Sequence, residues 1–279
     1  MVKEIQNRTT DLIGRGGMGD VYKAVDVQTN QPVAIKHLKS ELIHSNPDML
    51  RRFNREGQAL RRLNHPNIVT IYDAGEEHDL AYIAMEFLKG HDLARYTKYD
   101  NLLPLPKVIN IIHKSALALD YAHQFNIVHR DIKPANIMYN PDNSEVKITD
   151  FGIARITDSS KTKTGTVLGT PTYMSPEQLA GKKVDGRSDL YSLGVMFYQM
   201  LAGTAPFRAD SMAALMFKIT NEPHPPIFEK RPDLESQLPC LSAVIDKALA
   251  KNADERYQTG REFARAIKDC VESCGQKHV

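Results

Sequence analysis

Three oxygen-bearing side chains lie at spacings that suit transfer of a phosphoryl group. Asp131 directly follows His129 and Arg130, Asn136 comes five positions later, and Asp150 opens an Asp-Phe-Gly triplet. An aspartate in the first position can accept a hydroxyl proton, whereas the asparagine and the second aspartate can hold Mg²⁺. Each of these short motifs alone occurs by chance in many chains. The prediction of phosphoryl transfer therefore depends on further motifs that lie in the expected order along the chain.

A glycine-rich segment, Gly14 to Val21, precedes these residues with the spacing G-x-G-x-x-G-x-V. Glycines permit positive φ and carry no side chain, so the backbone can approach phosphates closely. The spacing also fits a dinucleotide-binding βαβ unit, but that reading needs a strand leading into a helix. Here a second strand follows, which is rich in Val and contains Tyr22. This favours a β-hairpin that covers a bound nucleotide. A plain glycine-rich turn is the simpler alternative.

Lys36 ends the apolar sequence Val-Ala-Ile-Lys on the next expected strand. An isolated buried ammonium group is very costly, so this lysine needs a partner, or its tip must reach water. If Lys36 has a partner, we expect it to contact the α- and β-phosphates of a nucleotide and to pair with an acidic residue of the following helix. Glu56 is the only acidic residue between Met49 and Leu63, which makes it the candidate.

The composition fits one large domain or two lobes. The chain has 279 residues, of which 42% are hydrophobic, enough for a sizeable core. Its net charge of +2 gives no reason to expect nucleic acid or an anionic membrane as partner. The first ten residues lack an apolar signal core, and no run reaches the roughly 18 apolar residues of a membrane span. We expect a cytoplasmic segment without membrane contact, although a longer parent protein could be membrane-anchored.

Three cysteines, Cys240, Cys270 and Cys274, lie late in the chain. Their number is odd and their spacing matches no zinc pattern. We therefore expect reduced structural thiols in a cytosolic setting.

Hydrophobic periodicity predicts a strand-rich first third followed by helices. Turn residues at 28–32 separate two alternating runs, which indicates a β-hairpin. An arginine cluster within 51–62 is read as the solvated face of a helix. The run 190–201 is apolar nearly all round, which indicates a helix buried on every side. The other expected strands are 68–72, 80–87, 137–139 and 146–149, and the other expected helices are 47–63, a long one containing 108–122, 209–220, 238–250 and 258–273.

The ordered motifs resemble a eukaryotic-like (Hanks-type) protein kinase, most closely the bacterial Ser/Thr kinases related to the mycobacterial receptor kinases. The departures are Ile132 for the commoner Leu and Ser175 for Ala, and neither removes a group that the reaction uses. The shared segments are 14–21, 33–36, 64–66, 129–138, 150–155, 169–178 and 185–194, with Arg256. The resemblance implies an α+β, bilobal protein-kinase fold, with a small β-rich N-lobe (1–88) and a larger helical C-lobe (89–279).

The resemblance also implies site residues. Asp131 would orient the substrate hydroxyl and accept its proton, and Lys133 would steady the γ-phosphate, a pattern typical of Ser/Thr kinases. Lys36 and Glu56 complete the catalytic set. Asn136 and Asp150 would hold Mg²⁺, with Mn²⁺ as an alternative. For the apolar members of the ATP pocket the plain alternative is ordinary core. The pocket residues are Ile13, Gly14, Gly16, Gly19, Val21, Ala34, Lys36, Met85, Glu86, Leu88 and Met138.

Further positions match supporting roles of the family. Thr162, Thr164 and Thr166 lie in the activation loop as autophosphorylation candidates, and Arg130 could pair with the added charge. Thr170 matches a residue that contacts the catalytic Asp, so it is not taken as a phosphosite. The supporting residues are assigned to the scaffold: a Glu177–Arg256 ion pair, Asp189 as anchor of the catalytic loop, and a packed column of Leu60, Ile71, His129 and Phe151.

These inferences predict a Ser/Thr protein kinase that transfers the γ-phosphoryl group of ATP to proteins, including itself in trans, with a possible homodimer. A pseudokinase that binds nucleotide without turnover is the alternative, but it should lack at least one of Lys36, Asp131, Asn136 and Asp150, and all are present. A small-molecule kinase of related fold should lack the peptide platform at 169–177.

Overall fold

The computed structural model describes residues 11–16, 19–39, 53, 57–77, 80–151 and 171–275. These residues form two compact units, and the chain first passes from one to the other between Lys89 and Gly90. Among the helices of the described part, none combines the length and apolar character needed to cross a membrane.

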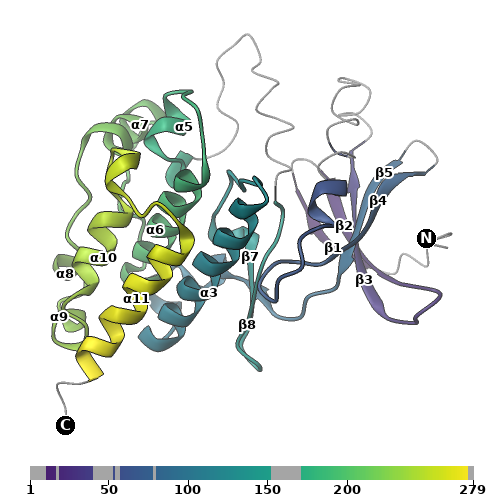
Figure 1. Cartoon of the computed structure of the whole chain (residues 1–279), viewed down its shortest axis with the longest axis horizontal. Coiled ribbons are helices and arrows are strands. Elements are labelled where there is room, and N and C mark those ends of the chain that lie inside the picture. Colours follow the sequence, from purple (N-terminus) through teal and green to yellow (C-terminus); the bar gives the residue numbers. More distant parts are fainter. Residues whose placement is uncertain are drawn as a thin grey trace. The chain divides into compact units, whose positions relative to one another are not determined.

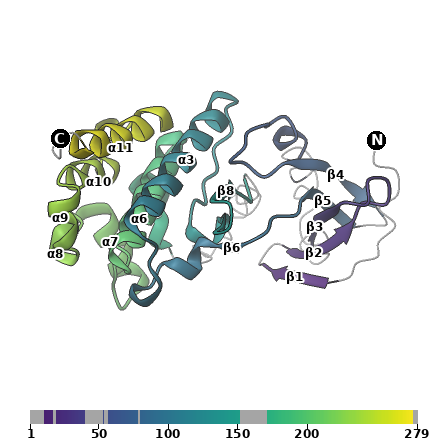
Figure 2. The same cartoon turned by 90° about the horizontal axis from the view of Figure 1, so that it is seen from below.

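The first unit contains a five-stranded antiparallel sheet in the order β1-β2-β3-β5-β4 (Figure 2). Its central strand, β3, is buried on both faces, with Val33 and Ile35 on one side and Ala34 and Lys36 on the other. The strands are β1 (Asp11–Arg15), β2 (Gly19–Val25), β3 (Pro32–Leu38), β4 (Ile71–Glu77) and β5 (Leu80–Glu86).

The predicted hairpin is confirmed by the pairing of β2 with β3. The register runs from Gly19 opposite Leu38 to Val25 opposite Pro32. Asn30, in the connecting turn, takes a φ of 53°, a left-handed conformation that asparagine tolerates better than most residues. Local turn chemistry is therefore sufficient to explain this part of the sheet.

The strand predicted at 68–72 is misplaced, because β4 starts at Ile71 and continues to Glu77. Ile68 and Val69 are buried, but they precede the strand. Residues 73–77 include Asp, Gly and two Glu, which have low strand propensity. Pairing with β5, with one register shift between Ile71 and Asp73, overrides that propensity. Most of the helix predicted at 47–63 lies outside the described residues; residues 53 and 57–60 are helical.

The second unit is built around α6 (Gly186–Ala202), whose side chains are buried almost all round, as predicted. It packs against α3 (Leu105–Gln124) and α10 (Leu241–Ala248), and α11 (Gly260–Gly275) packs along α3 (Figure 1). Gly194 permits the close approach of α6 and α10, because a Cβ there would lie 2.8 Å from the Cβ of Ala248.

Shorter elements complete this unit. β6 (His91–Asp92), β7 (Ile137–Asn140) and β8 (Glu145–Ile148) form a small sheet in that order. The β7–β8 hairpin directly follows the segment that contains Asp131 and Asn136. The remaining described elements are α5 (Pro176–Leu179), α7 (Met212–Asn221), α8 (Ile227–Lys230), α9 (Asp233–Gln237), η1 (Leu93–Tyr96), η2 (Tyr99–Asn101), η3 (Pro134–Asn136), η4 (Pro171–Tyr173) and η5 (Ala253–Glu255).

The expectation of three reduced thiols is wrong for two of them. Cys240 and Cys270 form a disulfide across 30 residues of sequence, and Cys274 is free. The start of α10 and the end of α11 pack together, which brings the two Cα atoms to 5.6 Å, within the usual range for a disulfide. Sequence spacing carries no information on that proximity.

Candidate active site

One buried carboxylate holds the backbone of the loop that carries Asp131. Asp189, on α6, is 1% exposed, and its two oxygens accept hydrogen bonds from the amides of His129 (2.8 Å) and Arg130 (2.7 Å). His123 also donates to Asp189 through Nε2, at 2.8 Å. Arg130 has a φ of 68°, which is strained for a non-glycine residue. The charge-assisted bonds to Asp189 offset that strain and fix the loop.

His129 is engaged through both ring nitrogens. Nε2 donates to the carbonyl oxygen of Thr149 at 2.8 Å, and Nδ1 accepts from the amide of Asp131 at 3.3 Å. The ring is fully buried and lies 4.6 Å from the ring of Phe151, centre to centre. These contacts agree with the packing role expected for His129, because neither nitrogen is available to exchange protons with a substrate.

Asp131 has one carboxylate oxygen held in place and one that is not. Oδ2 accepts from Lys133 Nζ at 2.7 Å and from Asn136 Nδ2 at 3.0 Å. Within the described part of the chain, Oδ1 accepts no hydrogen bond. The side chains of Asp131 and Lys133 are 38% and 37% exposed, so both can meet a molecule from solution. The carboxylate is therefore oriented by its neighbours and keeps a lone pair for a proton donor.

Asn136 and Asp150 lie at the same end of the β7–β8 hairpin. Thr149 donates to the Asn136 carbonyl oxygen from its amide (2.9 Å) and its hydroxyl (3.1 Å), next to the paired residues Ile137 and Ile148. Both amide hydrogens of Asn136 point to Asp131, to its carbonyl oxygen (2.7 Å) and to Oδ2 (3.0 Å), so neither of them occupies the amide oxygen that was expected to bind metal. Amide and carboxylate oxygens are ligands that suit a hard cation such as Mg²⁺ or Mn²⁺.

Lys36 is buried, with 8% of its surface exposed, so the solvent-reaching alternative does not describe it. It lies on β3 opposite Val21 on one side and Ile83 on the other. Ala34 and Met85, also expected to line an ATP pocket, are buried in the same sheet.

The other expected pocket residues of the first unit are more open. Ile13 is 47% exposed, and Val21, Glu86 and Leu88 are half-buried. Glu86 accepts from the amide of Thr70 at 2.6 Å. Gly14 and Gly16 lie at the end of β1 and beyond it, and a Cβ on Gly19 would overlap the carbonyl oxygen of His37. Met138 belongs to β7 of the second unit.

Several expected site residues fall outside the described part of the chain. They are Glu56 and the three activation-loop threonines, Thr162, Thr164 and Thr166. Their roles stay predictions.

A family model for the protein kinase domain matches residues 8–271, nearly the whole chain. The chain belongs to the protein kinase domain family. Its fold is the α+β protein-kinase fold, as the resemblance implied.

Curated relatives of the chain are named as bacterial serine/threonine-protein kinases. The kinase domain is 43% identical over 260 residues to the serine/threonine-protein kinase PknB of Mycolicibacterium smegmatis, covering 91% of this chain and 41% of that protein. It is 41% identical over 270 residues to the kinase pkn3 of Myxococcus xanthus, covering 94% of this chain and 49% of that protein. The chain thus spans less than half the length of these curated relatives.

A solved structure shares the fold. The crystal structure of Rad53 1-466 in complex with AMP-PNP matches with a TM-score of 0.76 and 26% identity, covering 92% of this chain and 64% of that one.

The Glu177–Arg256 pair that the family implied is formed in the kinase domain. Arg256, 1% exposed, donates from its two terminal nitrogens to the two carboxylate oxygens of Glu177, at 2.8 and 2.9 Å. Ser188 donates to the same carboxylate at 2.5 Å. Arg256 also donates to the carbonyl oxygens of Ala250 (2.7 Å) and Lys251 (2.8 Å). This bidentate pair joins α5 to the segment before α11, far from Asp131 in sequence.

The pair should make stability depend on pH in the acid range. Burial alone would raise the pKa of Glu177, but hydrogen bonds from Arg256 and Ser188, with the charge of Arg256, lower the pKa from 4.5 to about 2. A depressed carboxyl pKa stabilises the fold fully above the unfolded value, and the stabilisation is lost as pH falls from about 4.5 towards 2. Denaturant titrations from pH 6 to pH 3 should show a steeper loss of unfolding free energy for the parent than for Glu177→Gln. Equal slopes would contradict the assignment.

Two residues that support the loop were not found by sequence reasoning. His123 contacts Asp189 from 66 positions away, and no local pattern signals that contact. Gln178 donates from its side chain to the carbonyl oxygen of Arg130 at 2.9 Å. Ser175 and Gln178 form a capping box at the start of α5, and this S-x-x-Q pattern was readable in the sequence.

Proposed function

We propose that this kinase domain transfers the γ-phosphoryl group of ATP to Ser and Thr hydroxyls of proteins. The observation that carries the proposal is the Asp131 carboxylate, which is fixed through Oδ2 and available through Oδ1. An oriented, partly exposed carboxylate can align a hydroxyl group and accept its proton as the oxygen attacks phosphorus.

The other polar groups of the site act by position and charge. Lys133, whose ammonium group lies 2.7 Å from Asp131, would steady the transferred group and favours a Ser/Thr acceptor. Asn136 and Asp150 would hold Mg²⁺, or Mn²⁺, which neutralises phosphate charge when bound. Lys36 would bind the α- and β-phosphates, with Glu56 as its partner. Most of the catalytic effect would then come from positioning and electrostatic stabilisation.

The adenine ring would be held by residues of both lobes, whose proposed bounds are 1–88 and 89–279. Apolar contacts would come from Ile13, Val21, Ala34 and Met138, and the base would pair with backbone groups of Met85–Leu88. Rad53, which shares the fold, was solved in complex with AMP-PNP, an ATP analogue, and this supports ATP as the nucleotide.

The proposed partners are protein substrates with Ser or Thr, and a second copy of this chain during autophosphorylation. We place the domain in the cytoplasm, where ATP is available, although a disulfide such as Cys240–Cys270 is rare in that reducing compartment.

Incubation of the purified chain with Mg-ATP and a Ser/Thr-rich protein tests the function. We expect phosphate on Ser and Thr of the acceptor and a rise in the intact mass of the chain in steps of one phosphate. Lys36→Met is the inactive control, because it removes the phosphate contact but should retain weak nucleotide binding. Transfer by the parent no faster than by Lys36→Met would refute active catalysis and favour the pseudokinase alternative.

We further propose that phosphorylation of Thr164 first, and then of Thr162, activates the kinase, with Thr166 as a weaker acceptor. Each phosphate adds a charge of about −2 that Arg130, Lys161 and Lys163 can pair with. Arg130 is next to Asp131, and its backbone is fixed by Asp189.

In the variant Thr162→Ala/Thr164→Ala, turnover of another protein should fall at least about 10-fold, whereas ATP affinity should change less than about 2-fold. These magnitudes are those expected when phosphorylation activates an enzyme by ordering a loop. The measurement is the initial rate with one protein substrate, together with phosphopeptide mapping of the parent. The exposed turn variant Thr29→Ala serves as a control of the same chemical change and should match the parent. Equal turnover, or full activity of a parent without loop phosphate, would rule out this switch.

A further inference from the structure

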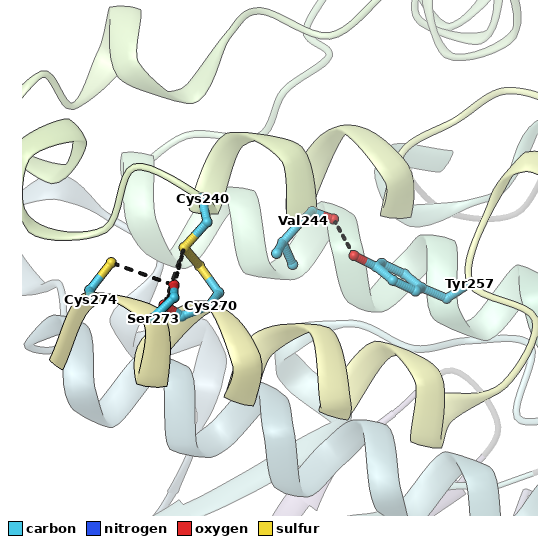
Figure 3. Close-up of a disulfide and its surroundings, with 6 residues drawn as sticks. All are labelled: Cys240, Val244, Tyr257, Cys270, Ser273 and Cys274. Carbon is cyan, nitrogen blue, oxygen red and sulfur yellow. Dashed lines mark hydrogen bonds between the residues drawn. A yellow bond between two sulfur atoms is a disulfide. The ribbon is translucent and has the colours of Figure 1, made fainter. Parts of the chain in front are cut away.

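Three cysteines meet where α10 begins and α11 ends (Figure 3). Cys240 is the residue directly before α10, and Cys270 and Cys274 lie in the last two turns of α11. Residues four apart on a helix lie on the same side, so both α11 cysteines face the region of Cys240. The disulfide joins Cys240 to Cys270, and Cys274 keeps its thiol.

The hydroxyl group of Ser273 lies between the free thiol and the disulfide. Its single hydrogen goes to the carbonyl oxygen of Cys270 at 2.8 Å. Ser273 Oγ lies 4.0 Å from Cys274 Sγ and 3.9 Å from Cys240 Sγ. A disulfide sulfur has no proton to donate, so the Cys240 contact is a van der Waals contact and the Cys274 thiol is the donor to Oγ. The Ser273 oxygen therefore lies within 4.0 Å of both the free thiol and one sulfur of the bridge (Figure 3).

The three sulfur positions differ in burial and in backbone context. Cys270 is 6% exposed, whereas Cys240 and Cys274 are half-buried. Cys240 precedes the first turn of α10, and Cys274 is the penultimate residue of α11, which ends at Gly275. Helix ends fray more readily than helix interiors. The two half-buried cysteines can therefore approach each other with less cost than Cys270 can move.

We propose that Cys240, Cys270 and Cys274 form a thiol–disulfide exchange site in which Cys240 bonds alternately to the two α11 cysteines. The Cys274 thiolate attacks Cys240 Sγ, a Cys240–Cys274 bond forms, and the Cys240–Cys270 bond breaks with its electron pair on the Cys270 sulfur. The proton lost by Cys274 goes to water, and the Cys270 thiolate takes one from water. The exchange therefore needs no oxidant and no reductant.

The exchange changes which thiol the kinase domain presents to solution. With the Cys240–Cys270 bridge, the free thiol is Cys274, which is half-buried and open to modification by thiol reagents. With the Cys240–Cys274 bridge, the free thiol is Cys270, whose position is buried. In both isomers a covalent bond ties the start of α10 to the end of α11. The site is a modification site for small thiols or electrophiles that can be hidden without reduction of the bridge.

Disulfide mapping of the parent protein tests the exchange directly. Protein purified without reductant is held at pH 8, quenched in acid, treated with N-ethylmaleimide and cleaved at acidic pH after glutamate. Cleavage after Glu235, Glu255, Glu262 and Glu272 puts each cysteine on a separate peptide. We expect cross-linked peptides of both isomers. Protein whose Cys274 is alkylated before the hold at pH 8 should give the Cys240–Cys270 product alone.

A parent that yields only the Cys240–Cys270 product after the hold, or that has all three cysteines alkylated, would overturn the proposal. A second pair of variants tests the alternative bond itself. The Cys270→Ser variant should form a Cys240–Cys274 disulfide. Alkylation of Cys240 should then be at least several-fold lower than in Cys270→Ser/Cys274→Ser. Circular dichroism should show that both variants are folded. Equal alkylation of Cys240 in the two variants would also refute the exchange.

Discussion

Replacing Asp131 with asparagine should lower phosphoryl transfer by about 10²–10⁴-fold, the usual contribution of a general base. The amide still accepts hydrogen bonds from Lys133 and Asn136 at the held oxygen, so the loop geometry should persist. In the proposed mechanism the amide cannot accept the substrate proton, and the negative charge that would align the hydroxyl is lost. The side chain is 38% exposed and fills no part of the core, so we expect a change in unfolding free energy of less than about 1 kcal/mol.

Initial rates at saturating ATP measure this loss, and nucleotide affinity is measured in parallel. Asp142→Asn makes the same chemical change on the exposed connection between β7 and β8, and its rate should equal that of the parent. Asp131→Asn turnover within threefold of the parent would remove Asp131 from the proposed mechanism. A large loss of ATP affinity in that variant would instead indicate a role in nucleotide binding.

Replacing Arg256 with methionine should destabilise the second unit by about 3–5 kcal/mol, the usual cost of removing one partner of a buried ion pair. Arg256 is 1% exposed, and it satisfies both oxygens of Glu177 and the carbonyl oxygens of Ala250 and Lys251. Methionine fills part of the volume but leaves the Glu177 carboxylate without its counter-charge. The Tyr191 ring, which lies 4.7 Å from the guanidinium carbon, loses a cation–π contact as well.

Urea titration followed by circular dichroism measures the change at pH 7. Arg265→Met is the matched control, because Arg265 is 81% exposed and its pair with Asp269 is a surface contact of 3.6 Å. We expect a control effect below about 0.5 kcal/mol, as for other exposed pairs. If Arg256→Met and Arg265→Met shift the urea midpoint equally, the buried pair does not hold α5 to the segment before α11.

The sequence determined the parts of this kinase domain that depend on near neighbours. The β2–β3 hairpin follows from turn residues between two alternating runs, and α6 follows from apolar residues all round the helix. Lys133 and Asn136 contact Asp131 from two and five positions away, so the centre of the candidate site lies within one short motif. Local spacing and local geometry carry the same information in such cases. The order of the motifs along the chain was then sufficient to predict the protein-kinase family.

Tertiary structure decided what depends on residues far apart in sequence. The position of β4 was set by pairing with β5 against its own propensity, and the contact of His123 with Asp189 spans 66 positions. The Cys240–Cys270 bond was missed because it depends on how α10 packs against α11, which the spacing of cysteines does not encode. The same reason explains why the sequence could name Asp131 but not say which of its oxygens is held. That choice follows from the directions of two neighbouring side chains, which only the folded loop defines.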